Sequence, residues 1–175
     1  VAVTFSSLTA TSATDALLEA FQVEARSWKG KAGSALDCSL RLRGFFLNLG
    51  VQLAAQGKLV VAFLRLNNVP IAMQIAAVHS RTYWLLKIGH DEEWAKVSPG
   101  FQLMMDVVRM IHELRFRRLE FLGAAEPWLN IWATGAREYT NLFFVPYTLG
   151  GIRAAAPIAG RRMISRILSS GTRRG

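Results

Sequence analysis

Hydrophobic residues recur at helical spacing in the first third of the chain. Residues 14–28 carry a single stripe of leucine, phenylalanine and alanine, which predicts an amphipathic helix. Residues 37–56 show a second helical pattern, and it stops at Gly57, a residue type that commonly ends helices. We therefore expect the chain to begin with two helices.

After Gly57 the spacing changes to that of strands. Asn67-Asn68 and Ser80-Arg81 interrupt the apolar pattern as two-residue turns, and asparagine tolerates the positive φ of a tight hairpin. The stretches on either side are rich in strand-forming residues: 58–66, 69–79 and 82–90. They predict an antiparallel meander of three strands.

A further helix and strand follow the meander. Residues 101–114 are apolar over a wide arc, as in a helix that packs on a sheet, and residues 117–122 read as a strand. The connection from strand 82–90 to this strand has the length of a right-handed crossover, which would make the two strands parallel. The predicted fold class is therefore α+β, with a mixed sheet made of an antiparallel meander and one β-α-β crossover.

The remaining pattern predicts a short helix at 126–133, a strand at 137–145 and a basic amphipathic helix at 149–168. The chain has 175 residues, of which 51% are hydrophobic and 19% charged, so it can bury a sizeable core. We expect one domain over residues 1–150, and a basic helix and tail over residues 151–175 that packs on it or trails from it.

The net charge of +9 is concentrated at the end of the chain. From Gly151 onward there are six arginines and no acidic residue, which leaves +3 for residues 1–150. This tail has no aromatic residue, so nucleic-acid binding is not expected, and a solvated or membrane-apposed amphipathic segment is favoured. The longest uncharged run, residues 66–80, is too short and too polar to span a bilayer.

Metal and triad chemistry find little support in the sequence. Cys38 is the only cysteine, so neither an internal disulfide nor a cysteine-rich zinc site can form. The three histidines, His79, His90 and His112, lack metal-ligand spacing and fit no Ser/His/Asp order. We expect no bound metal.

The segment Ser98-Pro99-Gly100 is the first candidate site. Ser98 can cap the following helix, Pro99 suits its first position, and Gly100 allows a ligand to approach the backbone. The free N–H groups of a helix start form an anion site suited to phosphate. The alternative is an ordinary, well-capped helix.

Two acidic positions are candidates for proton transfer. Asp91 opens an acidic trio at the end of strand 82–90, just before the phosphate site, and this trio is either functional or a solvated loop. Glu120 lies within an apolar run, where a carboxylate needs either a salt bridge, most simply to arginine, or a cleft. Trp128 and Trp132 are expected to line the core or a cleft.

This order of elements resembles the GNAT acyltransferase fold, in which acyl-CoA lies with its pyrophosphate on the helix after the fourth strand. Asp91, Ser98-Pro99-Gly100, Glu120-Phe121 and the two tryptophans make the chain similar to the CelD-like branch associated with cellulose biosynthesis, which is related to the FemAB aminoacyltransferases. That branch carries Asp-x-x-Tyr-Ala-x-x-Ser-Pro-Gly, then Asp-Phe, then Gly-Asp-x-x-Tyr-Lys and a Trp.

The resemblance implies an acyltransferase that moves an acyl group, most simply acetyl, from acyl-CoA to an amine or hydroxyl of a sugar or cell-envelope precursor. It implies Glu120 or Asp91 as the base that takes the acceptor proton. It also implies a pyrophosphate site at the helix start and an acceptor site after the last strand: Ser98, Pro99, Gly100, Phe101 and Gln102 for the cofactor; Glu126, Trp128 and Trp132 for the acceptor.

The sequence departs from the branch at Ala125 and Leu129, where the pattern has aspartate and lysine, and it lacks the usual Arg/Gln-x-x-Gly-x-Gly/Ala loop. These departures favour an alternative, a non-catalytic GNAT-like half-domain. Such a module would partner a second GNAT-like domain or serve a polysaccharide-synthesis assembly. In either case we expect a cytoplasmic location, or a peripheral one at the inner membrane through the arginine-rich tail.

Overall fold

The computed structural model describes residues 2–7, 10–27, 39–123 and 126–138, and a few single positions from 144 to 153. Two compact units divide the chain, residues 1–124 and 125–175, and each is described by itself. Most of the predicted strand 137–145 and of the predicted helix 149–168 lies outside the described residues.

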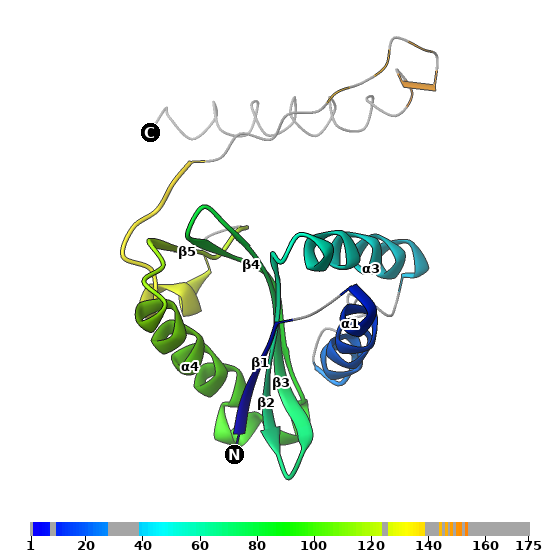
Figure 1. The fold of residues 1–175 in the computed structure, drawn as a ribbon. Coiled ribbons are helices and arrows are strands. Elements are labelled where there is room, and N and C mark those ends of the chain that lie inside the picture. Colours follow the sequence, from blue (N-terminus) through cyan, green and yellow to red (C-terminus); the bar gives the residue numbers. More distant parts are fainter. Residues whose placement is uncertain are drawn as a thin grey trace, which may run out of the picture. The chain divides into compact units, whose positions relative to one another are not determined.

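The first unit is built on a five-stranded sheet with the order β1-β2-β3-β4-β5 (Figure 1). The first four strands pair antiparallel, and β5 runs parallel to β4, so the predicted mixed sheet with one crossover is confirmed. The strands are β1 (Ala2–Ser7), β2 (Leu59–Leu66), β3 (Val69–His79), β4 (Thr82–His90) and β5 (Arg118–Glu120).

Both predicted hairpin turns are present. Asn67 and Asn68 have φ values of 50° and 66°, and Ser80 and Arg81 have φ values of 49° and 57°. Two consecutive residues with positive φ give a turn whose twist matches that of the flanking strands. The meander therefore forms where the turn residues place it.

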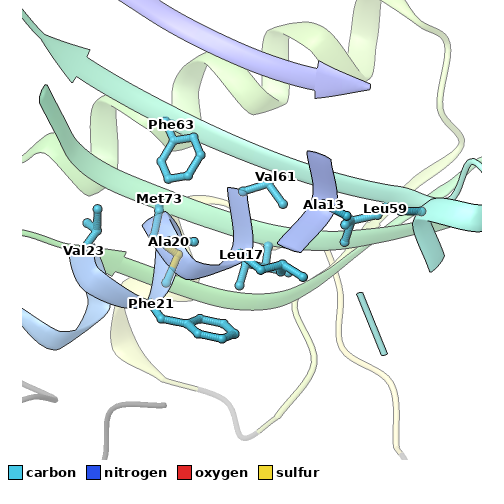
Figure 2. Close-up of a cluster of buried hydrophobic side chains, with 11 residues drawn as sticks. Ala13, Leu17, Ala20, Phe21, Val23, Leu59, Val61, Phe63 and Met73 are labelled. Atoms are coloured by element: carbon cyan, nitrogen blue, oxygen red, sulfur yellow. The ribbon is translucent and has the colours of Figure 1, made fainter. Parts of the chain in front are cut away.

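Helices cover both faces of this sheet. Helices α1 (Ala10–Ala25) and α3 (Leu40–Ala55) lie on one face, and α4 (Pro99–Glu113) lies on the other (Figure 1). A buried hydrophobic cluster joins α1 to β2 and β3, as Figure 2 shows, and Ala54 of α3 belongs to it. Its members are Ala13, Leu17, Ala20, Phe21, Val23, Ala54, Leu59, Val61, Phe63, Met73 and Ile75.

Helix α4 is the crossover element between β4 and β5. Its inner face is buried through Leu103, Met104, Val107 and Ile111. The remainder of its wide apolar arc is exposed: Phe101 (45%), Met105 (46%) and Val108 (36%). Residues 92–97 form the short 3₁₀ helix η2 (Glu92–Val97), which leads from β4 into α4.

Candidate active site

Ser98 forms the junction between η2 and α4. Its backbone is left-handed, with φ 49° and ψ 54°, and its N–H donates to the carbonyl of Ala95 at 2.9 Å. Pro99 follows at the first helical position, as predicted. The Ser98 side chain makes no capping hydrogen bond, so the prediction that it caps the helix is wrong. A residue that caps a helix with its side chain typically has an extended backbone, whereas the backbone of Ser98 is left-handed.

The predicted phosphate amides are not equivalent. The N–H groups of Phe101 and Gln102 donate to the Ser98 carbonyl at 3.0 and 3.2 Å, and the Gln102 side chain donates to the carbonyl of Val97 at 2.6 Å. The N–H of Gly100 has no acceptor among the described residues. Of the three predicted amides, the one left for an anion at the start of α4 is therefore that of Gly100.

Space for a ligand at Gly100 is bounded by the end of β4. A Cβ placed on Gly100 would lie 3.6 Å from Nδ1 of His90, an ordinary van der Waals distance. His90 is the last residue of β4 and is half-buried. The helix start and the imidazole thus lie side by side, and the N-terminal end of the helix dipole favours an anion there.

Asp91 is a buried structural carboxylate, 6% exposed. Its Oδ2 accepts a hydrogen bond from Nε of Arg26 at 2.6 Å, and its Oδ1 accepts one from the N–H of Glu93 at 3.1 Å. It therefore caps η2 and ties the end of β4 to the residue that follows α1. The alternative of a solvated acidic loop fails for Asp91 because both of its oxygen atoms are bonded within the protein.

Asp91 also borders an open hollow of about 460 Å³ between α1, the β2–β3 turn and η2. Glu120 is not among the residues that line this hollow. The structure therefore does not bring the two predicted bases together.

Glu120 ends the short strand β5, and its side chain is 13% exposed. Nε of Arg118 lies 3.7 Å from its Oε1, so the expected arginine salt bridge is confirmed. Across the sheet Glu120 is in register with Trp84. Nearby, burial raises the pKa of the Tyr83 hydroxyl above its usual range, which keeps that group uncharged near neutral pH.

The β4–β5 ladder is short. Only Thr82, Tyr83 and Trp84 of β4 pair with β5. Within the described part of the chain, the edge of β4 from Leu85 to His90 has no strand beside it on the β5 side. This stretch of β4 also carries a β-bulge, since Ile75 of β3 pairs with Lys87 but the next residue, Ala76, pairs with Leu85. β5 ends at Glu120, so the rest of this β4 edge lies beyond the ladder, and such an edge can pair with an extended ligand.

The predicted acceptor residues belong to the second unit. Nε1 of Trp128 donates to Oε2 of Glu126 at 2.6 Å, so the structure brings these two together at the 3₁₀ helix η3 (Pro127–Ile131). Trp132 follows directly and is half-buried. η3 occupies the place of the helix predicted at 126–133.

Comparison with known families identifies this arrangement. The family described as "Acetyltransferase (GNAT) domain" matches residues 2–129. The chain belongs to the GNAT acetyltransferase family. The GNAT fold, the acetyltransferase activity and acetyl-CoA as co-substrate are thereby confirmed at the level of the family. No curated protein matches the chain significantly.

Solved GNAT structures share the fold at low sequence identity. An aminoglycoside acetyltransferase from an uncultured soil metagenomic sample, in complex with sisomicin, is 11% identical, with a TM-score of 0.55 over 82% of this chain and 96% of its own. A GNAT family acetyltransferase from Staphylococcus aureus is 11% identical, with a TM-score of 0.53 over 82% of this chain and 100% of its own. The ribosomal-protein-alanine N-acetyltransferase from Brucella melitensis is 11% identical, with a TM-score of 0.53 over 83% of this chain and 100% of its own.

One buried charge was missed by sequence reasoning. Glu24 of α1 is fully buried and forms an ion pair with Lys87 of β4. A signal was present, because Glu24 follows Phe21 by three residues on the buried stripe of the helix.

Metal sites and membrane-spanning helices were also sought among the described residues. There, no group of three or more His, Cys, Asp or Glu side chains is suited to a metal ion, and no helix is long and apolar enough to cross a bilayer.

Proposed function

We propose that this GNAT chain transfers an acetyl group from acetyl-CoA to an amine or hydroxyl of a sugar or cell-envelope precursor, as a member of the CelD-like, FemAB-related branch. The observation that carries the proposal is the edge of β4 beyond Trp84, which has no β5 partner and ends beside the start of α4. An extended pantetheine arm needs such an edge, and a pyrophosphate needs such a helix start.

Each end of the donor has residues of this chain to hold it. The Gly100 amide, backed by the α4 dipole, is available to the pyrophosphate, and Ser98 and Pro99 fix its position. Phe101 and Gln102 contribute less than the sequence implied, because their amides already bond to Ser98. In this proposal the pantetheine arm lies along β4 between Leu85 and His90, beyond the residues that pair with β5.

Glu120 is the base in this proposal. It is in register with Trp84, the last β4 residue in the β4–β5 ladder, so it lies where that ladder ends. Its Oε1 lies 3.7 Å from Nε of Arg118. Asp91 differs, because both of its oxygens accept hydrogen bonds within the protein, at 2.6 and 3.1 Å. Glu126, Trp128 and Trp132 are proposed to contact the acceptor, and Asp91 becomes a structural residue.

The test is an acetyl-transfer assay with the full chain, acetyl-CoA and a panel of amino sugars that includes glucosamine and sisomicin, read as release of the CoA thiol. At least one amine should raise thiol release by tenfold or more over protein without acceptor. The chain with Gly100→Glu is the control and should stay at the background rate. Binding of acetyl-CoA without transfer to any member of the panel would contradict the proposed acceptor class.

A second candidate, the non-catalytic half-domain, is favoured by one observation. Ala125 and Leu129 replace the aspartate and lysine of the CelD-like pattern. In that case the chain partners a second GNAT-like domain or serves a polysaccharide-synthesis assembly. The arginine-rich tail would then hold it at the inner face of a membrane, and we propose a cytoplasmic or peripheral location for both candidates.

A further inference from the structure

A buried ion pair links α1 to the central part of β4. Glu24 is 0% exposed, and its Oε1 lies 3.8 Å from Nζ of Lys87. The Lys87 side chain is 25% exposed and also lies over the ring of Phe46 from α3, 5.3 Å from its centroid. The ammonium group is therefore held between two helices on one face of the sheet, with one side open to solvent.

The backbone is shaped to bring Glu24 this close to β4. A Cβ placed on Gly89 would lie 3.1 Å from Cα of Glu24 and 3.2 Å from Cε of Met73. Any side chain at position 89 would require α1 to shift. Gly89 therefore lets α1 pack tightly on β4 at the turn of the helix that carries Glu24.

Packing of α1 on β4 does not require a buried ion pair such as Glu24 with Lys87. Replacing a buried ion pair by apolar side chains of similar volume is often neutral or stabilising, so such a pair calls for a role beyond stability. Another ion pair between α1 and the sheet joins Glu19 to Arg65 of β2 at 2.6 Å, and its carboxylate is more exposed, at 35% against 0% for Glu24. Lys87 differs in lying on the stretch of β4 that has no β5 partner.

We propose that Lys87, held by Glu24 as its positioning residue, faces the sulfur atom of bound CoA and stabilises it as the leaving group. This inference rests on the proposed function, because it needs acetyl-CoA to lie along β4 beyond its ladder with β5. When the acceptor nitrogen bonds to the acetyl carbon, the carbon–sulfur bond breaks and its electron pair goes to sulfur. The proton of the acceptor nitrogen passes to Glu120, and Lys87 donates a hydrogen bond to the thiolate.

The test measures the ionisation of the CoA thiol while it is bound to the full chain, as the thiolate ultraviolet absorbance across pH with CoA-free protein subtracted. A free thiol has a pKa of about 8.5, and an ammonium group within hydrogen-bonding range lowers a thiol pKa by one unit or more. We expect the thiol on the wild-type chain to ionise at least tenfold more readily than free CoA. Lys87→Met should abolish this difference, and Lys87→Arg should keep most of it.

The controls separate position from charge. Arg65→Met removes the cation of the other α1-to-sheet ion pair and should leave the thiol titration unchanged. Glu24→Gln should weaken the effect, because Lys87 is then no longer held. If Lys87→Met fails to fold, the double variant Glu24→Leu with Lys87→Leu replaces the pair by apolar side chains and tests the same expectation.

The outcomes are distinguishable from failure of the proposed function. CoA that binds the wild-type chain but whose thiol ionises like free CoA would overturn the role of Lys87 and leave the donor site intact. Identical thiol titrations on the Lys87→Met variant and on the wild-type chain would also overturn the role of Lys87 and leave the donor site intact. A wild-type chain that does not bind CoA at all would contradict the donor site itself.

Discussion

Glu120→Gln is expected to lower turnover of acetyl-CoA by about 10²–10⁴-fold, the usual contribution of a general base. Glutamine keeps the shape of the side chain and its place on β5 but cannot take a proton. The measurement is CoA thiol release with the best acceptor of the amine panel, together with the affinity for acetyl-CoA. The affinity should stay within about threefold of wild type, because Glu120 acts on the acceptor.

Asp91→Asn is the matched control for this prediction. Asp91 is the other carboxylate that the sequence offered as a base, and both of its oxygens accept hydrogen bonds within the protein. Its loss should lower the free energy of unfolding by about 1–3 kcal/mol and change turnover little once the protein is folded. A large fall in turnover with Asp91→Asn and none with Glu120→Gln would reverse the assignment.

Gly100→Glu is expected to abolish stabilisation by acetyl-CoA. At about a hundred times its dissociation constant the ligand adds roughly 2.7 kcal/mol, or about 5–11 °C in Tm for a chain of this length. The substitution places a carboxylate where the pyrophosphate should bind. The fold should survive, since the added Cβ meets only His90 at 3.6 Å and an acidic side chain suits a helix start. The variant should shift by less than about 1 °C.

Gly44→Glu is the control for the added charge. Gly44 lies within α3, and nothing lies within 4 Å of a Cβ placed there. This variant should keep the full shift with acetyl-CoA. If both glutamate variants keep it, the pyrophosphate does not bind at the start of α4.

Much of the fold was predictable because it depends on local signals. The turns at Asn67-Asn68 and Ser80-Arg81 fix the meander, and the length of the segment after strand β4 fixes a crossover. Strand β1 was missed, because its partner β2 lies more than fifty residues away and no turn signal links the two. Its pairing depends on contacts that sequence periodicity does not encode.

The candidate site was predictable in part. The position of Pro99 at the start of α4 followed from residue type, but the sequence does not show that the Ser98 carbonyl accepts from Phe101 and Gln102. The salt bridge of Glu120 followed from its apolar neighbours, whereas the ion pair of Asp91 did not, because Arg26 is distant in the sequence. Burial of Glu24 likewise depends on how closely α1 approaches β4.

The central claim is that acetyl-CoA pairs with the open edge of β4, and amide hydrogen exchange tests it most directly. In the full chain with saturating acetyl-CoA, amides between Leu85 and His90 that point away from β3 should exchange at least tenfold more slowly than without ligand. Amides of Thr82 to Trp84, which already lie in the β5 ladder, should change little. Acetyl-CoA that binds without slowing exchange between Leu85 and His90 would contradict the account.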